Sequence, residues 1–160
     1  MAETGSSAKK QKILIGWREW VSLPDLAVPH IKAKIDTGAR TSALHAYYVE
    51  PYKKKGERRV RFGLHPYQGS TSIAVECDAH VIDFRNVTDS GGHREKRYVI
   101  STYLEIASQV WEIEMTLTNR ENMKFRMLLG RTAMNKKVVV DPGRSYLLGK
   151  PPRVKRRLVR

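Results

Sequence analysis

The segment 31–42, with the sequence IKAKIDTGARTS, constrains the fold of this chain more than any other. Apolar and polar residues alternate along it up to Asp36, and the apolar side carries Ile31, Ala33 and Ile35. This period of two predicts a strand with one buried face. Gly38 follows closely and tolerates a φ above zero, so we expect a tight turn with Asp36 at the tip of the strand. The Thr37 hydroxyl and the Gly38 and Ala39 amides could then hold the carboxylate in a fixed pose.

Short apolar or alternating segments recur along the rest of the chain. The clearest is 111–118, in which every second residue is apolar. Strands are also expected at 12–23 (one or two), 43–49, 60–62, 73–81, 98–106, 125–129 and 138–140. A single short helix is expected at 131–137. Many short strands separated by turn residues predict an all-β barrel with one short C-terminal helix.

The turn signals give several connections. Pro24-Asp25 and Pro29 are expected to separate the first strands from the signature strand, and 43–49 to return beside that strand as a hairpin. The segments 53–59 and 63–72 are predicted to be loops. Ser90-Gly91-Gly92-His93 lies between two strand-like segments, which predicts a hairpin with its tip there.

Length and charge limit the organisation and the partners. The 160 residues suit one domain, predicted at 12–148, after a disordered lead at 1–11 and before a basic tail at 149–160. One cysteine, no apolar segment long enough for a membrane span and no apolar leader predict a cytoplasmic protein. Lys and Arg number 30 against 16 Asp and Glu, a formal net charge of +14, which favours polyanionic partners.

The segment around Asp36 resembles known enzymes. Asp36-Thr37-Gly38-Ala39 resembles the catalytic signature of aspartic peptidases. The longer string 35–45, IDTGARTSALH, is similar to a bacterial family of retropepsin-like proteins, the RimB type, which was first labelled ATP-dependent zinc proteases. The similarity continues through WEIEMTLTNR at 111–120, MLLGR at 127–131 and Val140-Asp141, and covers residues 12–148.

This resemblance implies a retropepsin-like barrel that supplies half of a catalytic site. An aspartic peptidase needs two carboxylates that share one proton, and this chain has a single Asp-Thr-Gly. The resemblance therefore implies a homodimeric aspartic endopeptidase with Asp36, Thr37 and Gly38 as catalytic residues from each subunit. Structural support is expected from the second retropepsin signature, Leu129-Gly130-Arg131, with the arginine in the subunit interface or, alternatively, solvated at the start of a helix.

The resemblance also suggests residues that contact the substrate. These are Ala39, Arg40, Thr41 and Ser42 after the catalytic turn, and Gly91 and Gly92 in a candidate flap that excludes water. Retropepsins usually carry an acidic residue where this chain has Arg40, and a guanidinium there could grip an acidic substrate side chain. Gly130 follows Asp36 by 94 positions, which implies inserted structure and leaves the position of the flap open.

No cofactor or metal is expected. Zinc needs clustered ligands, and the five histidines are scattered, with Cys77 and His80 the nearest pair. No glycine-lysine pattern of a nucleotide-binding loop is present. The family association instead implies a protein substrate, the oligoglutamate tail that an ATP-dependent ligase adds to a ribosomal protein.

Two other functions fit parts of the sequence. The charge and the basic tail also suit a non-enzymatic basic β-barrel that binds RNA or the ribosome. A peptidase fold that only dimerises and acts as a scaffold is a third possibility. Asp36 favours the peptidase over the RNA-binding barrel, because a phosphate-binding surface gains nothing from a fixed carboxylate at its centre.

Overall fold

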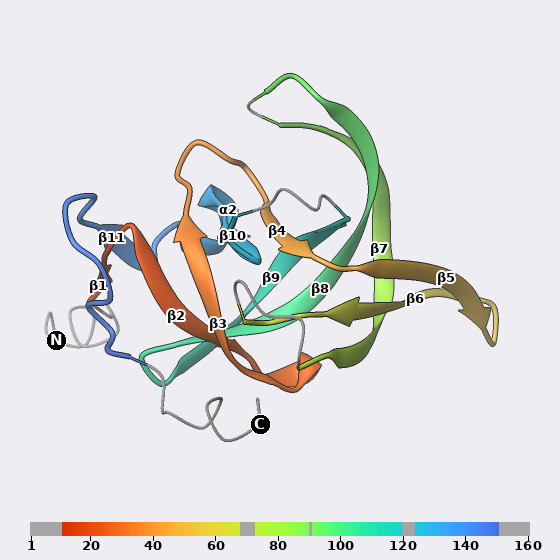
Figure 1. Ribbon diagram of the computed structural model, residues 1–160, viewed down its shortest axis with the longest axis horizontal. Helices are drawn as coiled ribbons and strands as arrows, with labels where there is room; N and C mark the ends of the chain where they lie inside the picture. Colours follow the sequence, from red (N-terminus) through yellow and green to blue (C-terminus); the bar gives the residue numbers. More distant parts are fainter. Residues whose placement is uncertain (1–10, 68–72, 90, 120–123, 151–160) are drawn as a thin grey trace, which may run out of the picture.

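The computed structural model describes residues 11–67, 73–89, 91–119 and 124–150, which form mostly β-structure (Figure 1). The strands are β1 (Ile13–Ile15), β2 (Arg18–Leu23), β3 (Val28–Ile35), β4 (Ser42–His45), β5 (Tyr48–Lys54), β6 (Glu57–Leu64), β7 (Val75–Thr88), β8 (Arg94–Ile106), β9 (Gln109–Thr118), β10 (Met127–Leu129) and β11 (Val138–Val140). A 3-10 turn, η1 (Pro24–Leu26), and one short helix, α2 (Arg131–Met134), complete the described elements. The predicted all-β class is confirmed.

Nine strands form one sheet in the order β2-β3-β10-β4-β9-β8-β7-β6-β5. An additional pairing of β2 with β8, at Ser22 and Glu105, closes the first six of them into a barrel. Beyond this ring, β5 and β6 extend away as a long arm, and the β7–β8 hairpin arches over the side toward which β3 points (Figure 1). Strands β1 and β11 form a separate parallel pair.

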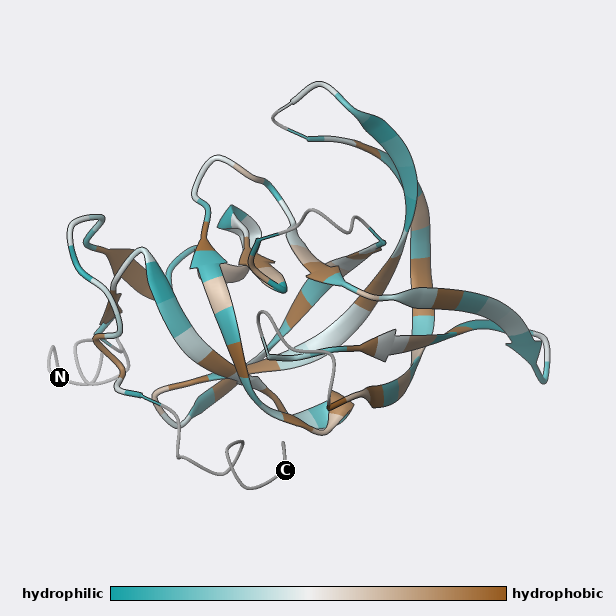
Figure 2. Cartoon of the chain, in the orientation of Figure 1, coloured by the Kyte–Doolittle hydropathy of each residue, from teal (hydrophilic) through white to brown (hydrophobic). Residues whose placement is uncertain are grey.

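The interior of the barrel is apolar, as the alternating segments predicted. Bands of apolar residues run along the barrel strands in Figure 2. Ile31, Ala33 and Ile35 of β3 are buried, and so are Ile113, Met115 and Leu117 of β9. Thr116 and Thr118 on the polar side of β9 are buried too, because that side faces the β7–β8 hairpin rather than solvent.

Three predicted connections were wrong. Pro29 lies within β3 and does not end a strand, because the register of β2 and β3 shifts beside it and a bulge tolerates the missing amide proton. Strand β4 does not return beside β3, because β10 lies between them, parallel to β3 and antiparallel to β4. The segment 53–59 is a hairpin of β5 and β6, since Lys55 and Gly56 both adopt positive φ and form its turn.

The ends of other elements also differ from the expectation. Helix α2 stops at Met134, and Lys136 then adopts a φ of 65°, which an α-helix does not continue. The expected strand at 125–129 is limited to β10, and the loop expected at 63–72 begins only after Leu64. The lead at 1–11 and the tail at 149–160 lie almost wholly outside the described residues.

Candidate active site

Asp36 follows directly after β3 and begins a tight turn. Its amide donates to the Leu129 carbonyl at 2.9 Å, which continues the pairing of β3 with β10 by one residue. Its Oδ1 accepts hydrogen bonds from the Gly38 amide at 3.1 Å and the Ala39 amide at 3.2 Å. The half-buried carboxylate is therefore held in one orientation by the backbone of its own turn, as predicted from the sequence.

The expected positive φ at Gly38 was wrong. Among the described glycines, positive φ occurs at Gly56, Gly92 and Gly149 only. A Cβ at position 38 would lie 3.4 Å from Asp36 Oδ1. This is an ordinary van der Waals distance, so neither a positive φ nor close packing requires glycine at this position.

A second segment braces the turn from the other end of the sequence. Arg131 and Thr132 donate their amides to the carbonyls of Ala39 and Arg40, at 2.7 and 3.0 Å. The Arg131 guanidinium adds a 3.0 Å bond to the Thr37 carbonyl. The loop after Asp36 is thereby fixed by main-chain bonds to the start of α2, and Arg131 binds the turn of its own chain.

At Gly130, the backbone before α2 comes closest to the backbone of the loop that follows Asp36. A Cβ built on Gly130 would lie 2.6 Å from the Thr41 carbonyl carbon and 2.9 Å from the Ser42 amide nitrogen. The Gly130 amide donates to the Ser42 hydroxyl at 3.0 Å, within the buried interior. Only a residue without a side chain lets the two backbones pack this closely.

A cavity of about 630 Å³ opens beside the turn. The β7–β8 hairpin forms one wall, and β9 and β10 contribute to the others. Its lining consists of Asp36, Gly38, Ala39, Arg40, Thr41, Ala43, Arg85, Asn86, Val87, Thr88, Asp89, Arg97, Thr116, Thr118 and Leu128. The volume and the mixed polar and apolar lining are in the range of ligand sites in proteins.

Three arginines line this cavity, and two of them are paired with acidic residues. Arg85 and Arg97 lie directly opposite each other on β7 and β8, while Arg40 lies on the loop after Asp36. Arg97 is buried, and its Nε contacts Glu95 Oε1 at 2.6 Å. Arg85 pairs with Asp83 at 2.9 Å and Glu114 at 3.4 Å, and Arg40 has no ion pair within the described residues.

Two carboxylates line the cavity among the described residues, Asp36 and Asp89. Asp89 Oδ1 accepts hydrogen bonds from the amides of Gly91 and His93, both at 2.9 Å. Asp89 therefore holds the tip of the β7–β8 hairpin in shape. Of these two carboxylates, Asp36 is therefore the one that lies on a braced loop and could contact a ligand in the cavity.

The structure separates the predicted site residues into groups. Ala39, Arg40 and Thr41 line the cavity, whereas Ser42 is fully buried and its hydroxyl serves Gly130. Thr37 is exposed, with only its carbonyl engaged by Arg131. The predicted hairpin at Arg85–Lys96 is confirmed, but Gly91 and Gly92 at its tip do not line the cavity, and Ser90 lies outside the described residues.

Sequence reasoning missed the stem of the hairpin and two threonines. Arg97 Nη1 donates to Thr116 Oγ1 at 3.4 Å, and Thr118 Oγ1 donates to Glu95 at 2.6 Å, so these side chains form one network. A hairpin symmetric about Gly91 places Arg85 opposite Arg97, and two like charges directly opposite each other destabilise a sheet. That pairing of two arginines was the sequence signal that could have identified the hairpin stem as part of the site.

The residues weighed for zinc are dispersed. Cys77 is buried and its thiol donates to the Leu26 carbonyl, while His80 is exposed beside Glu57. Burial raises the pKa of the Cys77 thiol to about 12. In the described part of the chain, no three His, Cys, Asp or Glu side chains gather closely enough to hold a metal ion.

A closed barrel with an Asp-Thr-Gly turn braced by a glycine between β10 and a short helix defines a retropepsin-like protein. The family model of RimB-like retropepsin-like aspartic endopeptidases matches residues 14–151. The chain therefore belongs to the RimB-like family. None of the described helices is long or apolar enough to cross a membrane.

The chain is also similar to curated proteins and to a solved structure. The chain is 50% identical over 138 residues to a probable alpha-L-glutamate ligase of Shewanella pealeana and 44% identical over 138 residues to one of Desulfotalea psychrophila. Each match covers 86% of this chain but only 30% of the relative. The crystal structure of Lpg0085 from Legionella pneumophila, a protein of unknown function, superposes with a TM-score of 0.73 at 25% identity, covering 86% of this chain and 99% of the other.

Proposed function

We propose that this chain is an aspartic endopeptidase that works as a homodimer, with Asp36 of each subunit in one catalytic pair. The observation that carries the proposal is the braced turn, in which two amides fix the Asp36 carboxylate beside an open cavity. Membership of a family described as aspartic endopeptidases supports the same chemistry.

The reaction follows from the chemistry of two adjacent carboxylates. They share one proton because like charges so close together cannot both ionise. The ionised carboxylate takes a proton from a bound water, and the water attacks the peptide carbonyl. The protonated carboxylate donates a hydrogen bond to that carbonyl, and the proton passes on to the leaving amine.

The second carboxylate comes from a second copy of the chain in this proposal. Asp89 is the other carboxylate in the described lining, and it is committed to the amides of the hairpin tip. A two-fold axis through the catalytic turn brings the same residue from both copies together, as in other closed dimers. The exposed Thr37 lies on the turn that would face this axis.

The substrate that we propose is an acidic tail of glutamate residues on a ribosomal protein. Arg40, Arg85 and Arg97 line the cavity, and guanidinium groups bind carboxylates with two parallel hydrogen bonds. Two of the similar proteins are named probable alpha-L-glutamate ligases, and they carry a segment like this chain within a longer protein. A domain of this kind joined to a glutamate ligase supports a substrate built from glutamate.

The test is a cleavage assay on oligoglutamylated and plain tail peptides, followed by mass spectrometry. Wild-type protein should shorten only the glutamylated peptide, and Asp36→Asn should leave it intact while keeping the wild-type circular dichroism spectrum. Asp25→Asn is a matched control, because it also neutralises one aspartate but lies in η1, exposed and outside the cavity lining. Full activity of Asp36→Asn would refute the peptidase assignment.

Salt dependence tests the choice of acidic substrates. The Debye length shrinks from about 10 Å at 0.1 M salt to about 3 Å at 1 M, so electrostatic attraction to the cavity weakens steeply. We expect the KM for glutamylated peptides to rise with salt and kcat to change less. Arg40→Ala should impair acidic peptides more than neutral ones of equal length, and a flat salt profile would argue against charge-based selection.

A further inference from the structure

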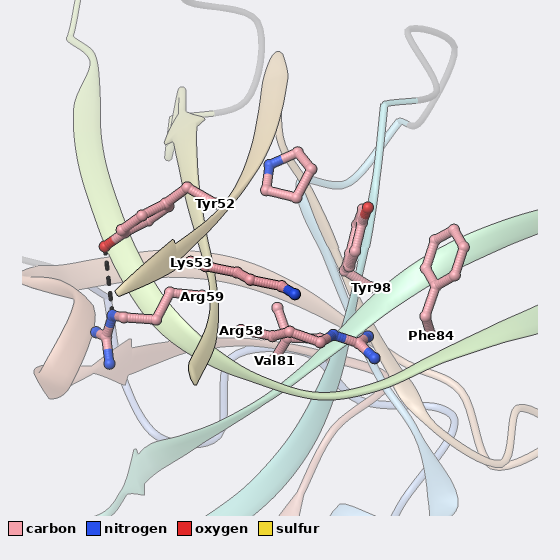
Figure 3. Close-up of a pocket in the computed structure, with 8 residues that line it drawn as sticks. Tyr52, Lys53, Arg58, Arg59, Val81, Phe84 and Tyr98 are labelled. Atoms are coloured by element: carbon pink, nitrogen blue, oxygen red, sulfur yellow. Dashed lines mark hydrogen bonds between the residues drawn. The ribbon is translucent and has the colours of Figure 1, made fainter. Parts of the chain in front are cut away.

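A second cavity, of about 400 Å³, lies between the β5–β6 arm and the β7–β8 hairpin and shares no lining residue with the first (Figure 3). We call it the arm groove. Its lining consists of Pro51, Tyr52, Lys53, Arg58, Arg59, Val81, Phe84 and Tyr98. Figure 3 shows the Lys53 and Arg58 side chains extending from the arm toward the side of Tyr98 and Phe84. The groove therefore combines cations on one wall with aromatic rings on the other.

The positions of two cations in the arm groove destabilise the sheet. Lys53 and Arg58 lie directly opposite each other in the β5–β6 ladder, and like charges in that position destabilise a sheet. The neighbouring positions are compensated, since Lys54 faces Glu57 and Arg59 pairs with Asp78 at 2.5 Å. Neither Lys53 nor Arg58 has an ion pair in the described part of the chain. An anionic ligand would relieve this repulsion.

The aromatic wall is also unusual for a sheet surface. Phe84 is 38% exposed and packs against Tyr98 on the opposite strand, with ring centroids 4.4 Å apart and the ring planes tilted by 31°. The register of β7 and β8 shifts between Val81 and Asp83, and such bulges re-aim the side chains around them. Lys96 lies 5.4 Å from the centroid of the Phe84 ring. A partly exposed pair of aromatic rings thus lies in the same groove as Lys53 and Arg58.

We propose that the arm groove binds single-stranded RNA. Bases would pack against the exposed part of Phe84, while Lys53 and Arg58 contact the phosphates, which is how proteins hold single strands. An acidic peptide would satisfy the cations but gain nothing from the ring. The groove's nucleic-acid chemistry is independent of the peptidase proposal, whereas the choice of RNA over DNA rests on the proposed ribosomal substrate.

Binding can be measured directly by fluorescence anisotropy with a labelled, unstructured RNA of about 12 nucleotides, within the range of single-strand sites. Phe84→Ala should weaken binding about tenfold through lost base stacking. The double variant Lys53→Ala/Arg58→Ala should reduce the slope of log K against log salt by about 1.4, because each lost phosphate contact of a single strand contributes about 0.7. No peptidase activity enters either readout.

Matched controls remove the same groups elsewhere. Tyr103→Ala deletes another exposed aromatic residue, 41% accessible, and Lys12→Ala/Arg144→Ala deletes one lysine and one arginine near β1, at the other end of the view in Figure 1. These variants should bind RNA like wild type, and thermal unfolding checks that each variant is folded. A DNA strand of the same sequence should bind more weakly than the RNA.

Three results would overturn the proposal. The first is equal weakening by groove and control variants, which would mean general attraction by the net charge. The second is DNA binding at least as tight as RNA binding. The third is an oligoglutamate peptide that binds the groove with affinity lost in Lys53→Ala/Arg58→Ala, while RNA binding stays unchanged.

Discussion

The loop at 36–42, which we call the Asp36 loop, and the arm groove are built in opposite ways. The Asp36 loop joins segments far apart in the sequence, and hydrogen bonds to the main chain of Leu129, Gly130, Arg131 and Thr132 hold it in place. The arm groove is made from two hairpins of neighbouring strands, and it leaves Lys53 and Arg58 facing each other. The first region achieves rigidity through close packing, whereas the second tolerates repulsion on the surface.

This difference indicates how each region responds to change. A side chain added at Gly130 must displace backbone atoms of the Asp36 loop, because main-chain atoms of Thr41 and Ser42 lie within 3 Å of a Cβ built there. A side chain changed in the arm groove meets solvent. We therefore expect substitutions in the loop to lower both stability and activity, and substitutions in the groove to alter binding alone.

The largest contrast should come from two glycines. Gly130→Ala places a Cβ 2.6 Å from the Thr41 carbonyl carbon, and such overpacking costs about 1–3 kcal/mol or more. Gly56→Ala, at the tip of the arm, meets no atom within 4 Å and costs only the strain of a φ of 81°, about 1–2 kcal/mol. Urea unfolding measures both free energies.

Activity should separate these two variants further. A shift of about 1 Å in a catalytic group can cost about a hundredfold in rate, so Gly130→Ala should lose peptidase activity that Gly56→Ala retains. Equal activity in the two variants would mean that the brace does not position Asp36.

Two hydroxyl groups sharpen the comparison. Ser42→Ala removes the acceptor of the buried Gly130 amide, and an unsatisfied buried donor costs about 1–3 kcal/mol. Tyr52→Phe removes a hydrogen bond to Asp78 on the exposed arm, where solvent replaces it and the cost stays below about 1 kcal/mol. Differential scanning calorimetry should give a clearly lower Tm for Ser42→Ala than for Tyr52→Phe.

A smaller effect is expected from the pH dependence of stability that Asp78 contributes at the arm. Burial alone would raise the pKa of Asp78, but hydrogen bonds from Tyr52 and Arg59 and the charges of Arg59 and Arg61 outweigh it and lower the pKa. Since the unfolded value is about 3.9, this stabilisation is present above about pH 4 and is lost as the pH falls through the folded value.

This is measured by urea unfolding of wild type and Asp78→Asn, at pH values from above about 4 down through the folded pKa of Asp78. The difference in their free energies of unfolding should shrink as the pH falls, because protonated Asp78 resembles the asparagine. A difference that is constant with pH would show that the ion pair with Arg59 contributes nothing.

The smallest effect concerns Cys77. Burial raises the pKa of its thiol to about 12, so hardly any thiolate exists at pH 8. A thiol-specific disulfide reagent should react slowly with the native protein and fast in urea. Rapid reaction of the folded chain would show that this part of the sheet opens readily.

Local patterns predicted much of this molecule. The alternation in β9, the turn at Asp36 and the β7–β8 hairpin each depend on neighbouring residues, and the structure has all three. The insertion of β10 between β3 and β4 could not be predicted in this way, because it is a pairing between distant segments. The role of Arg97 in the cavity was missed for the same reason, since it depends on Thr116 of another strand.

The central claim is that each chain supplies one half of a catalytic pair, and mixing subunits tests it most directly. A fixed amount of wild-type chain is allowed to exchange with increasing Asp36→Asn, and copurification of differently tagged copies verifies the exchange. Activity per wild-type chain should fall toward zero at high excess, because nearly every wild-type chain then has a partner without its carboxylate. Activity that stays constant would contradict the shared site and place the whole catalytic centre in one chain.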